Sequence, residues 1–281
     1  MAANPTTAPR LFDRALLVER QRRADARGPA TFLFDRVAED LAERLGAVMR
    51  NFTTAADIWT PGEGLAAHLG GRLKSVRRVA LSPQETLPFA PESLDLALSA
   101  LGLQFADDLP GMLAQIRRAL KPDGLLLAAM IGGDTLTELR QSFAAAEAEC
   151  EGGVSPRVAP FADLRDLGGL LQRAGLALPV TDVDRVVVRY DSAFALMADL
   201  RRMGATNSLI ERRRTPTRRA TLLRAAQVYG ERFADPDGRI RATFDVIWLS
   251  AWAPHEGQQK PLRPGSGRVS LEEAIRKASK G

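Results

Sequence analysis

The first fifty residues carry the spacing of amphipathic helices. Apolar residues recur at intervals of one, three and four between Leu11 and Arg50, with acidic and basic residues between them. Gly28-Pro29 interrupts this pattern, and proline suits the first turn of a new helix. We therefore expect two helices before the first strand, forming an outer layer or a lid.

Short apolar runs alternate with helical patterns along the rest of the chain. Strands are expected where apolar residues are continuous or alternate with polar ones, at residues 55–59, 77–82, 94–101, 125–131, 180–190 and 243–252. Helices are expected at residues 65–69, 109–120, 161–174, 194–203 and 221–233. This alternation predicts an α/β fold with a doubly wound, mostly parallel sheet.

Two turns punctuate this pattern. Lys121-Pro122-Asp123-Gly124 is expected to end a helix, because proline cannot continue it and Gly124 can supply a positive φ. Gly175 is expected to cap the end of the helix that precedes it.

The chain of 281 residues is long enough for one elaborated domain. We divide it into an N-terminal helical segment (1–50), an α/β domain (51–254) with a helical insertion at about 191–235, and a C-terminal tail (255–281) with a short helix from Leu271. No apolar run approaches the roughly 20 residues that a membrane span needs. The acidic residues Asp13, Glu19 and Asp25 argue against a mitochondrial transit peptide, so we expect a cytoplasmic protein, of bacterial type.

Composition limits the chemistry that the chain can carry. The single cysteine, Cys150, excludes a disulfide framework and a cysteine-based zinc cluster. The two histidines, His68 and His255, do not form the spacing of a non-haem iron site, so we expect no metal.

The formal charge of +5 is partly local, in the basic stretch from Arg212 to Arg219. This stretch is either a solvated helix face and loop or a docking patch for an acidic partner. No aromatic residues are interleaved with it to stack bases, so nucleic acid is not an expected partner. The sequence leaves the oligomeric state open.

Two motifs resemble those of class I S-adenosylmethionine (SAM) dependent methyltransferases. Leu87-Pro88-Phe89 followed by Ser93-Leu94-Asp95 resembles the "LPF…SFD" signature before the fourth strand of that family. Ala119-Leu120-Lys121-Pro122-Asp123-Gly124 resembles the "LKPGG" turn before its fifth strand.

Three further segments are similar to one branch of that superfamily. They are Ala129 to Arg140, Glu151 to Pro156 and Met197 to Asn207. The branch contains the complex I assembly factor 5 proteins, their bacterial relatives and, close by, the malonyl-carrier-protein methyltransferases of biotin synthesis. The resemblance implies a Rossmann-like fold, SAM as cofactor and a respiratory complex subunit as partner. In mitochondrial members it also implies hydroxylation of an arginine.

The loop expected to hold SAM departs from the family pattern D-x-G-x-G-x-G. Asp57, Gly62 and Gly64 align with it only when one extra residue is allowed. Glycine is needed there because a Cβ would collide with the cofactor. Trp59 occupies the region of the first glycine, and Pro61 removes an amide donor.

The connection after this loop is also short. The family has roughly twenty more residues between the loop and the Leu87 motif, so either one βα unit is missing or two are compressed. The expected strand at 77–82 ends without an acidic residue to bind a ribose, and Glu85 is the nearest carboxylate. We therefore expect SAM to bind weakly or not at all.

Further candidates for a substrate or partner cleft follow the later strands. They are Gln104, where relatives often carry His-Trp, and Gly132, Asp134, Arg140, Asn207 and His255. Asp134 either caps the following helix or contacts a substrate, because ligands bind at the carboxyl ends of parallel strands. His255 has either a structural role or a ligand.

No residue can be assigned a catalytic role from the sequence, and two functions remain open. In the first, the chain is a degenerate methyltransferase that acts by binding, in the assembly or maturation of a respiratory complex or another multisubunit enzyme. In the second, it is an active methyltransferase for a protein or small molecule, with a rearranged pocket.

Overall fold

A computed structural model describes residues 10–71, 73–82 and 84–259. The expected helix from Leu271 and the first nine residues lie outside this part of the chain.

A six-stranded sheet forms the centre of the fold, in the order β2-β1-β3-β4-β6-β5. The strands are β1 (Ala55–Ile58), β2 (Val76–Val79), β3 (Leu94–Ala100), β4 (Leu120–Gly132), β5 (Ala177–Tyr190) and β6 (Ile240–Trp252). The first four are parallel to one another, and β6 runs antiparallel to both of its neighbours. The expected α/β fold with a mostly parallel sheet is confirmed.

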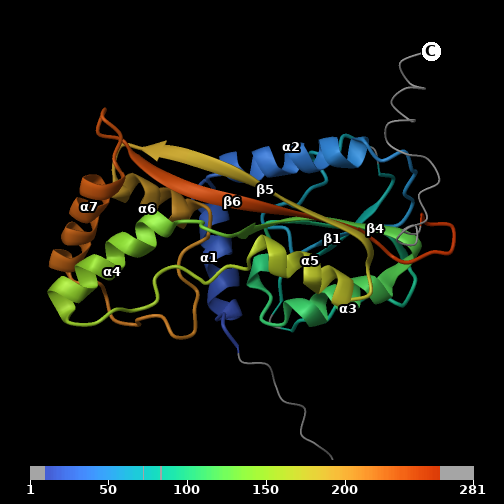
Figure 1. The fold of residues 1–281 in the computed structure, drawn as a ribbon, viewed down its shortest axis with the longest axis horizontal. Helices are drawn as coiled ribbons and strands as arrows, with labels where there is room; N and C mark the ends of the chain where they lie inside the picture. Colours follow the sequence, from blue (N-terminus) through green and yellow to red (C-terminus); the bar gives the residue numbers. More distant parts are fainter. Residues whose placement is uncertain (1–9, 72, 83, 260–281) are drawn as a thin grey trace, which may run out of the picture.

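Helices cover both faces of this sheet (Figure 1). They are α1 (Arg14–Ala26), α2 (Phe32–Gly46), α3 (Leu109–Ala119), α4 (Thr137–Glu151), α5 (Leu164–Arg173), α6 (Ala193–Arg202) and α7 (Arg219–Phe233), with a short 3₁₀ helix, η1 (Leu103–Phe105). The helix α2 lies on one face, and α3 and α5 lie on the other (Figure 1). The break between α1 and α2 falls at Gly28-Pro29, as expected.

The central strands are buried on both faces. Every residue of β3 is buried, and its side chains alternate between two apolar layers. Leu96 and Leu98 pack toward α2, whereas Ala97 packs toward α3. This burial accounts for the nearly continuous apolar sequence of β3 and β4.

Two local expectations are wrong. Residues 65–69 form turns and not a helix, because Gly70 and Gly71 follow at once with positive φ values of 57° and 72°. The helix α3 ends at Ala119, as expected, but the residues Lys121 to Gly124 belong to β4, where the pairing with β3 shifts register, and the positive φ of 61° falls on Asp123 and not on Gly124. The cap at Gly175 is as expected, with a φ of 79°.

The last two strands extend beyond the rest of the sheet. Of the two strands beside β6, only β5 pairs with residues 240–244, since β4 ends opposite Asp245. The helices α4, α6 and α7 pack against this extension, at the left of Figure 1. Two of them, α6 and α7, come from the expected helical insertion.

The part of the sheet formed by β1 and β2, where the family resemblance places the cofactor, is short. We call this part the cofactor half. Between β1 and β3, β2 is the only helix or strand among the described residues. Of the two interpretations of this short connection, the single strand β2 fits the loss of one βα unit better than the compression of two.

Candidate functional site

The loop after β1 folds onto its own aspartate. The Asp57 carboxylate accepts hydrogen bonds from the Thr60 hydroxyl and from the Leu65 amide, the latter at 2.9 Å. A Cβ on Gly64 would lie 2.5 Å from Asp57 Oδ2. Burial raises the pKa of Asp57, and these hydrogen bonds oppose the rise only in part. Gly64 thus makes room for a side chain of the protein itself.

Trp59, in the same loop, is buried. Its φ is +60°, and its side chain is 2% exposed, in the same apolar layer as Leu87 and Leu103. Its carbonyl oxygen approaches the end of β3 so closely that a Cβ on Gly102 would lie 2.5 Å away. The residue in the place of the first family glycine is therefore a core residue.

Polar groups on the other side of the loop are also engaged. The Arg78 guanidinium, from β2, donates to the carbonyls of Thr60 and Gly62. Glu85 accepts the amides of Asp107 and Asp108 at 2.6 and 3.0 Å and forms an ion pair with Arg14. The carboxylate closest in sequence to the missing ribose ligand thus holds the loop after β3.

The N-terminal segment crosses the same edge. The amides of Leu11 and Phe12 donate to Asp107 Oδ1 at 2.8 and 3.0 Å, and Arg14 donates to Asp107 Oδ2 at 2.9 Å. The Arg14 guanidinium lies 5.6 Å from the centroid of the Trp59 ring. The start of α1 therefore lies against this edge.

A second polar network lies at the end of β4. The Asp245 carboxylate, from β6, accepts the Asp134 amide at 2.9 Å and the Arg185 guanidinium at 2.7 and 2.8 Å. Arg185 also donates to Asp134 Oδ2 at 2.8 Å. Burial raises the pKa of Asp245, but the hydrogen bonds from Arg185 and Asp134 outweigh it, so the pKa is lowered overall.

Glycine is required in this network. Gly133 has a φ of +55°, and a Cβ on it would lie 2.6 Å from Asp245 Oδ2. Asp134 does not cap α4, because the N-cap residue is Leu136 and the Asp134 side chain turns to Arg185. Asp245 was not among the residues expected here from the sequence, although a charged residue within a buried strand is a usable signal.

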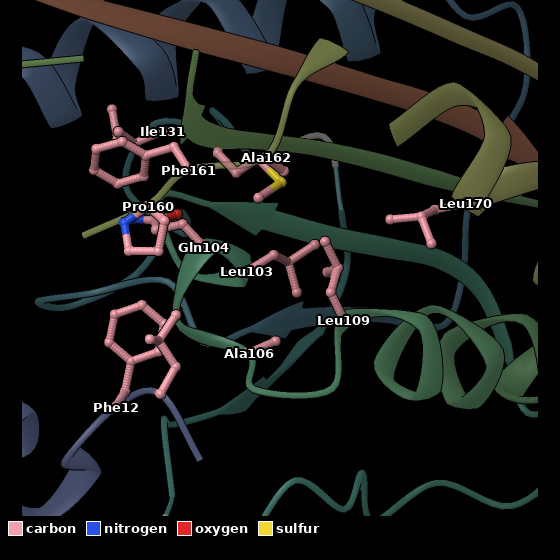
Figure 2. Close-up of a pocket in the computed structure, with 12 residues that line it drawn as sticks. Phe12, Leu103, Gln104, Ala106, Leu109, Ile131, Pro160, Phe161, Ala162 and Leu170 are labelled. Atoms are coloured by element: carbon pink, nitrogen blue, oxygen red, sulfur yellow. The ribbon is translucent and has the colours of Figure 1, made fainter. Parts of the chain in front are cut away.

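Two cavities adjoin the end of β4. The first has a volume of about 240 Å³ and lies between η1, the N-terminal segment and residues 160–162 (Figure 2). Its walls include Phe12, Leu103, Gln104, Met130, Phe161 and Leu170. The second, of about 330 Å³, is lined by charged side chains, Asp134, Asp163, Arg185 and Asp245, and by Phe161.

Phe161 lines both cavities, because residues 160–163 cross the end of β4. The Gly133 amide donates to the Ala162 carbonyl at 3.1 Å and fixes this crossing. Residues 57–64 line neither of these two cavities.

Gln104 carries an unusual group in the first cavity. Its Nε2 donates to the Leu101 carbonyl at 2.7 Å, which fixes the orientation of the amide. Its Oε1 is buried and has no hydrogen-bond partner among the described residues. Buried acceptors in folded proteins are normally paired.

The structure does not bring all the expected cleft residues together. Asn207 Nδ2 donates to the Pro156 carbonyl at 2.7 Å, and Asn207 Oδ1 accepts the Leu209 amide, so this side chain fastens two loops. Arg140 is exposed on α4 and donates to Thr137. Neither residue lines the two cavities.

The placement of His255 in this cleft is wrong. Trp252, at the end of β6, pairs with Leu125 near the start of β4, so His255 lies at the opposite edge of the sheet. Its imidazole Nδ1 accepts the Gly257 amide at 3.1 Å in a local turn.

The basic stretch is partly engaged within the molecule. Arg212 donates to Asp13 at 3.0 Å, and Arg213 forms an ion pair with Glu151. Arg214, Arg218 and Arg219 are exposed.

Comparison with known proteins now places the chain. Residues 35–128 match the family model described as a methyltransferase domain. Over 295 aligned residues the chain is 37% identical to the human arginine-hydroxylase NDUFAF5, mitochondrial, covering 95% of this chain and 85% of the human protein. The chain belongs to the NDUFAF5 family. The zebrafish (Danio rerio) member is 36% identical and covers 85% of this chain and 81% of its own length.

A second group of relatives is bacterial. The malonyl-[acyl-carrier protein] O-methyltransferase of Xylella fastidiosa is 43% identical over 169 residues, covering 60% of this chain and 55% of that protein. Among solved structures, the YcgJ protein of Bacillus subtilis has a TM-score of 0.52 at 13% identity and covers 78% of this chain and 98% of its own. A putative methyltransferase of Bacillus halodurans has a TM-score of 0.51 at 15% identity, covering 77% of this chain and 99% of its own. At this identity the two structures establish the fold alone.

Within residues 10–71, 73–82 and 84–259, no helix has the length and apolar character that crossing a bilayer requires. In the same residues, no three His, Cys, Asp or Glu side chains gather as a metal site would need.

Proposed function

We propose that this NDUFAF5-family protein recognises an arginine-bearing segment of a respiratory complex I-type subunit during assembly, and that it does not use SAM as the methyltransferases of this fold do. One observation carries the proposal. At the carboxyl edge of the sheet, the protein's own side chains fill the cofactor half, whereas the half beyond β3 contains two cavities.

The residues of the cofactor half do not fit SAM. The Trp59 side chain and carbonyl fill the space beside β1, and Gly64 accommodates Asp57 where the family glycine would admit a cofactor. Glu85 is engaged by Arg14 and two amides, and no other acidic residue stands between β2 and Glu85. Each lost charge-assisted hydrogen bond costs about 1.5–3 kcal/mol. A micromolar affinity corresponds to only about −8 kcal/mol.

The partner and the arginine come from the family. The human and zebrafish relatives are named arginine-hydroxylases, and the branch that the motifs resemble acts in complex I assembly. A cytoplasmic, bacterial setting remains our expectation for this chain.

A titration tests the cofactor part of the proposal. Isothermal titration calorimetry of the full-length chain with SAM and with S-adenosylhomocysteine should show no binding at micromolar concentrations. A malonyl-[acyl-carrier protein] O-methyltransferase serves as the positive control. A clear low-micromolar affinity would instead support the alternative function, an active methyltransferase with a rearranged pocket.

A capture experiment tests the partner part. The tagged full-length chain, purified from a related bacterium under mild conditions, should retain a subunit of a complex I-type enzyme in mass spectrometry. Recovery of no component of that complex or another multisubunit enzyme would contradict the proposal. The cofactor result does not affect this readout.

A further inference from the structure

We propose that the cavity of about 240 Å³ receives the arginine side chain of the partner and that Gln104 Oε1 selects it. This inference rests on the proposed function, because it locates the arginine site of that same activity. Gln104 would be a specificity-determining residue, which binds the guanidinium without taking part in its chemistry.

The orientation of the Gln104 amide shows which of its atoms is free to bind a ligand. The Leu101 carbonyl only accepts hydrogen bonds, so the atom 2.7 Å from it must be the donor, Nε2. The other end of the amide is then the acceptor Oε1, which is buried and unpaired among the described residues. Leaving such a group unpaired is costly, so a ligand that brings an N–H donor relieves a penalty that an apolar ligand leaves in place.

The size and walls of the cavity carry the second step. Its volume of about 240 Å³ lies below the roughly 300–1,000 Å³ of sites for drug-sized ligands, so it fits a single side chain better than a nucleotide cofactor. The walls are mainly apolar, which suits an aliphatic stem. Figure 2 shows the Phe12 and Phe161 rings on either side of Gln104, and aromatic faces attract a planar cation.

The charge beyond Phe161 carries the third step. The second cavity presents three carboxylates, Asp134, Asp163 and Asp245, against the single guanidinium of Arg185. A cationic side chain is attracted to this region and an anionic one is repelled. Among side chains with an apolar stem and N–H donors, arginine satisfies the acceptor, the rings and the charge together.

Peptide binding to the full-length chain tests this assignment. The probes are three short blocked peptides that differ only in one residue, which is arginine, citrulline or norleucine. Wild-type protein should bind the arginine peptide at least about 10-fold more tightly than the norleucine peptide, as expected for one hydrogen bond from a charged donor. The citrulline peptide keeps the N–H donors without the charge and should fall between the two.

Substitution of Gln104 should reduce this preference. Gln104→Leu and the similarly sized Gln104→Met should lose most of the preference for the arginine peptide over the norleucine peptide, because neither offers the amide acceptor, and only the attraction of the rings and the carboxylates remains. Gln141→Leu makes the same change on the exposed face of α4 and should keep the wild-type preference. Thermal unfolding establishes that each variant is folded, and the Met variant replaces the Leu variant if the latter is not.

Two outcomes overturn the inference. One is equal binding of the arginine and norleucine peptides by wild-type protein, and the other is an unchanged preference in a folded Gln104 variant. Neither outcome affects capture of a complex I-type subunit, which tests the proposed function alone.

Discussion

The loop after β1 and the loop after β4 share one structural feature, but the first is closed and the second borders a cavity. In each loop, a glycine with positive φ lies against a buried aspartate: Gly64 against Asp57 and Gly133 against Asp245. Around Asp57 the loop closes on the carboxylate, and Trp59 of the same loop is buried in the apolar layer with Leu87 and Leu103. Around Asp245 a guanidinium, Arg185, neutralises the carboxylate, and a cavity remains open.

This difference shows what a glycine motif can and cannot indicate. A glycine is needed wherever another atom approaches the backbone closely, and that atom belongs either to a ligand or to the protein. At both positions the nearest atoms belong to the protein: Asp57 and Arg78 lie against Gly64, and Asp245 lies against Gly133. A glycine that aligns with the family's cofactor motif can therefore also make room for a side chain of the protein, as Gly64 does for Asp57.

The largest expected effect on stability comes from removing the Trp59 side chain from the loop after β1. Trp59→Ala should lower the free energy of unfolding by about 3–5 kcal/mol, because a buried aromatic side chain is replaced by a cavity. Urea denaturation measures this change. Trp252→Ala, at a half-buried position, is the matched control and should cost less. An equal or smaller loss for Trp59→Ala would show that the cofactor half is not closed by core packing.

A smaller effect is expected from filling the close contact in the open half. Gly133→Ala should lower the free energy of unfolding by about 2–4 kcal/mol, because it adds overpacking against Asp245 to the strain of a positive φ. Gly238→Ala separates the two terms, since a Cβ there meets nothing within 4 Å and only the strain at a φ of 83° remains. If the two variants are equally stable in denaturation experiments, the Asp245 side chain moves away from the new methyl group and the overpacking costs nothing.

The smallest effect concerns the charge of the open half and depends on pH. The pKa of Asp245 is lowered in the folded protein, so its ionised form stabilises the fold above the ordinary aspartate pKa of about 3.9 and this contribution is lost as pH falls through the lowered value. Asp245→Asn should therefore cost about 1.5–3 kcal/mol at pH 7, with the difference from wild type shrinking below about pH 4.

Denaturation at a series of pH values checks this expectation. Asp191→Asn is the control, because Asp191 is 83% exposed and its ion pair with Arg239 should contribute little. A difference between wild type and Asp245→Asn that persists unchanged at low pH would mean that the cost comes from packing and not from charge.

Periodicity alone located most of the fold, and the failures have physical causes. The strands at 94–100 and 120–132 are long and apolar, so the sequence marks them clearly. The segment 65–69 has helical spacing, but two left-handed glycines end it after one turn. The register shift that absorbs Lys121 to Gly124 into β4 depends on pairing with β3, which no local pattern contains.

The site was partly predictable. The sequence placed Gly132 and Asp134 after a buried strand, at the edge where parallel strands end. In the structure Asp134 lines the second cavity, whereas Gly132 lines neither of the two. The prediction for His255 was wrong, because the residues of the last strand do not indicate whether it runs parallel or antiparallel to its neighbours. Since β6 is antiparallel to β4, the residues that follow it lie at the opposite edge of the sheet. The ion pair between Arg185 and Asp245 could not be predicted, because it depends on the register between β5 and β6, which the sequence does not show.

The position of β6 also governs the order in which the protein can be built. β6 lies between β4 and β5, although both of those strands leave the ribosome before it. Until residues 240–252 emerge, β4 and β5 each present an open edge, and unpaired edges invite pairing with other chains. A product truncated before residue 240 would keep both edges exposed, so for this fold the most damaging truncations remove the strand that is made last.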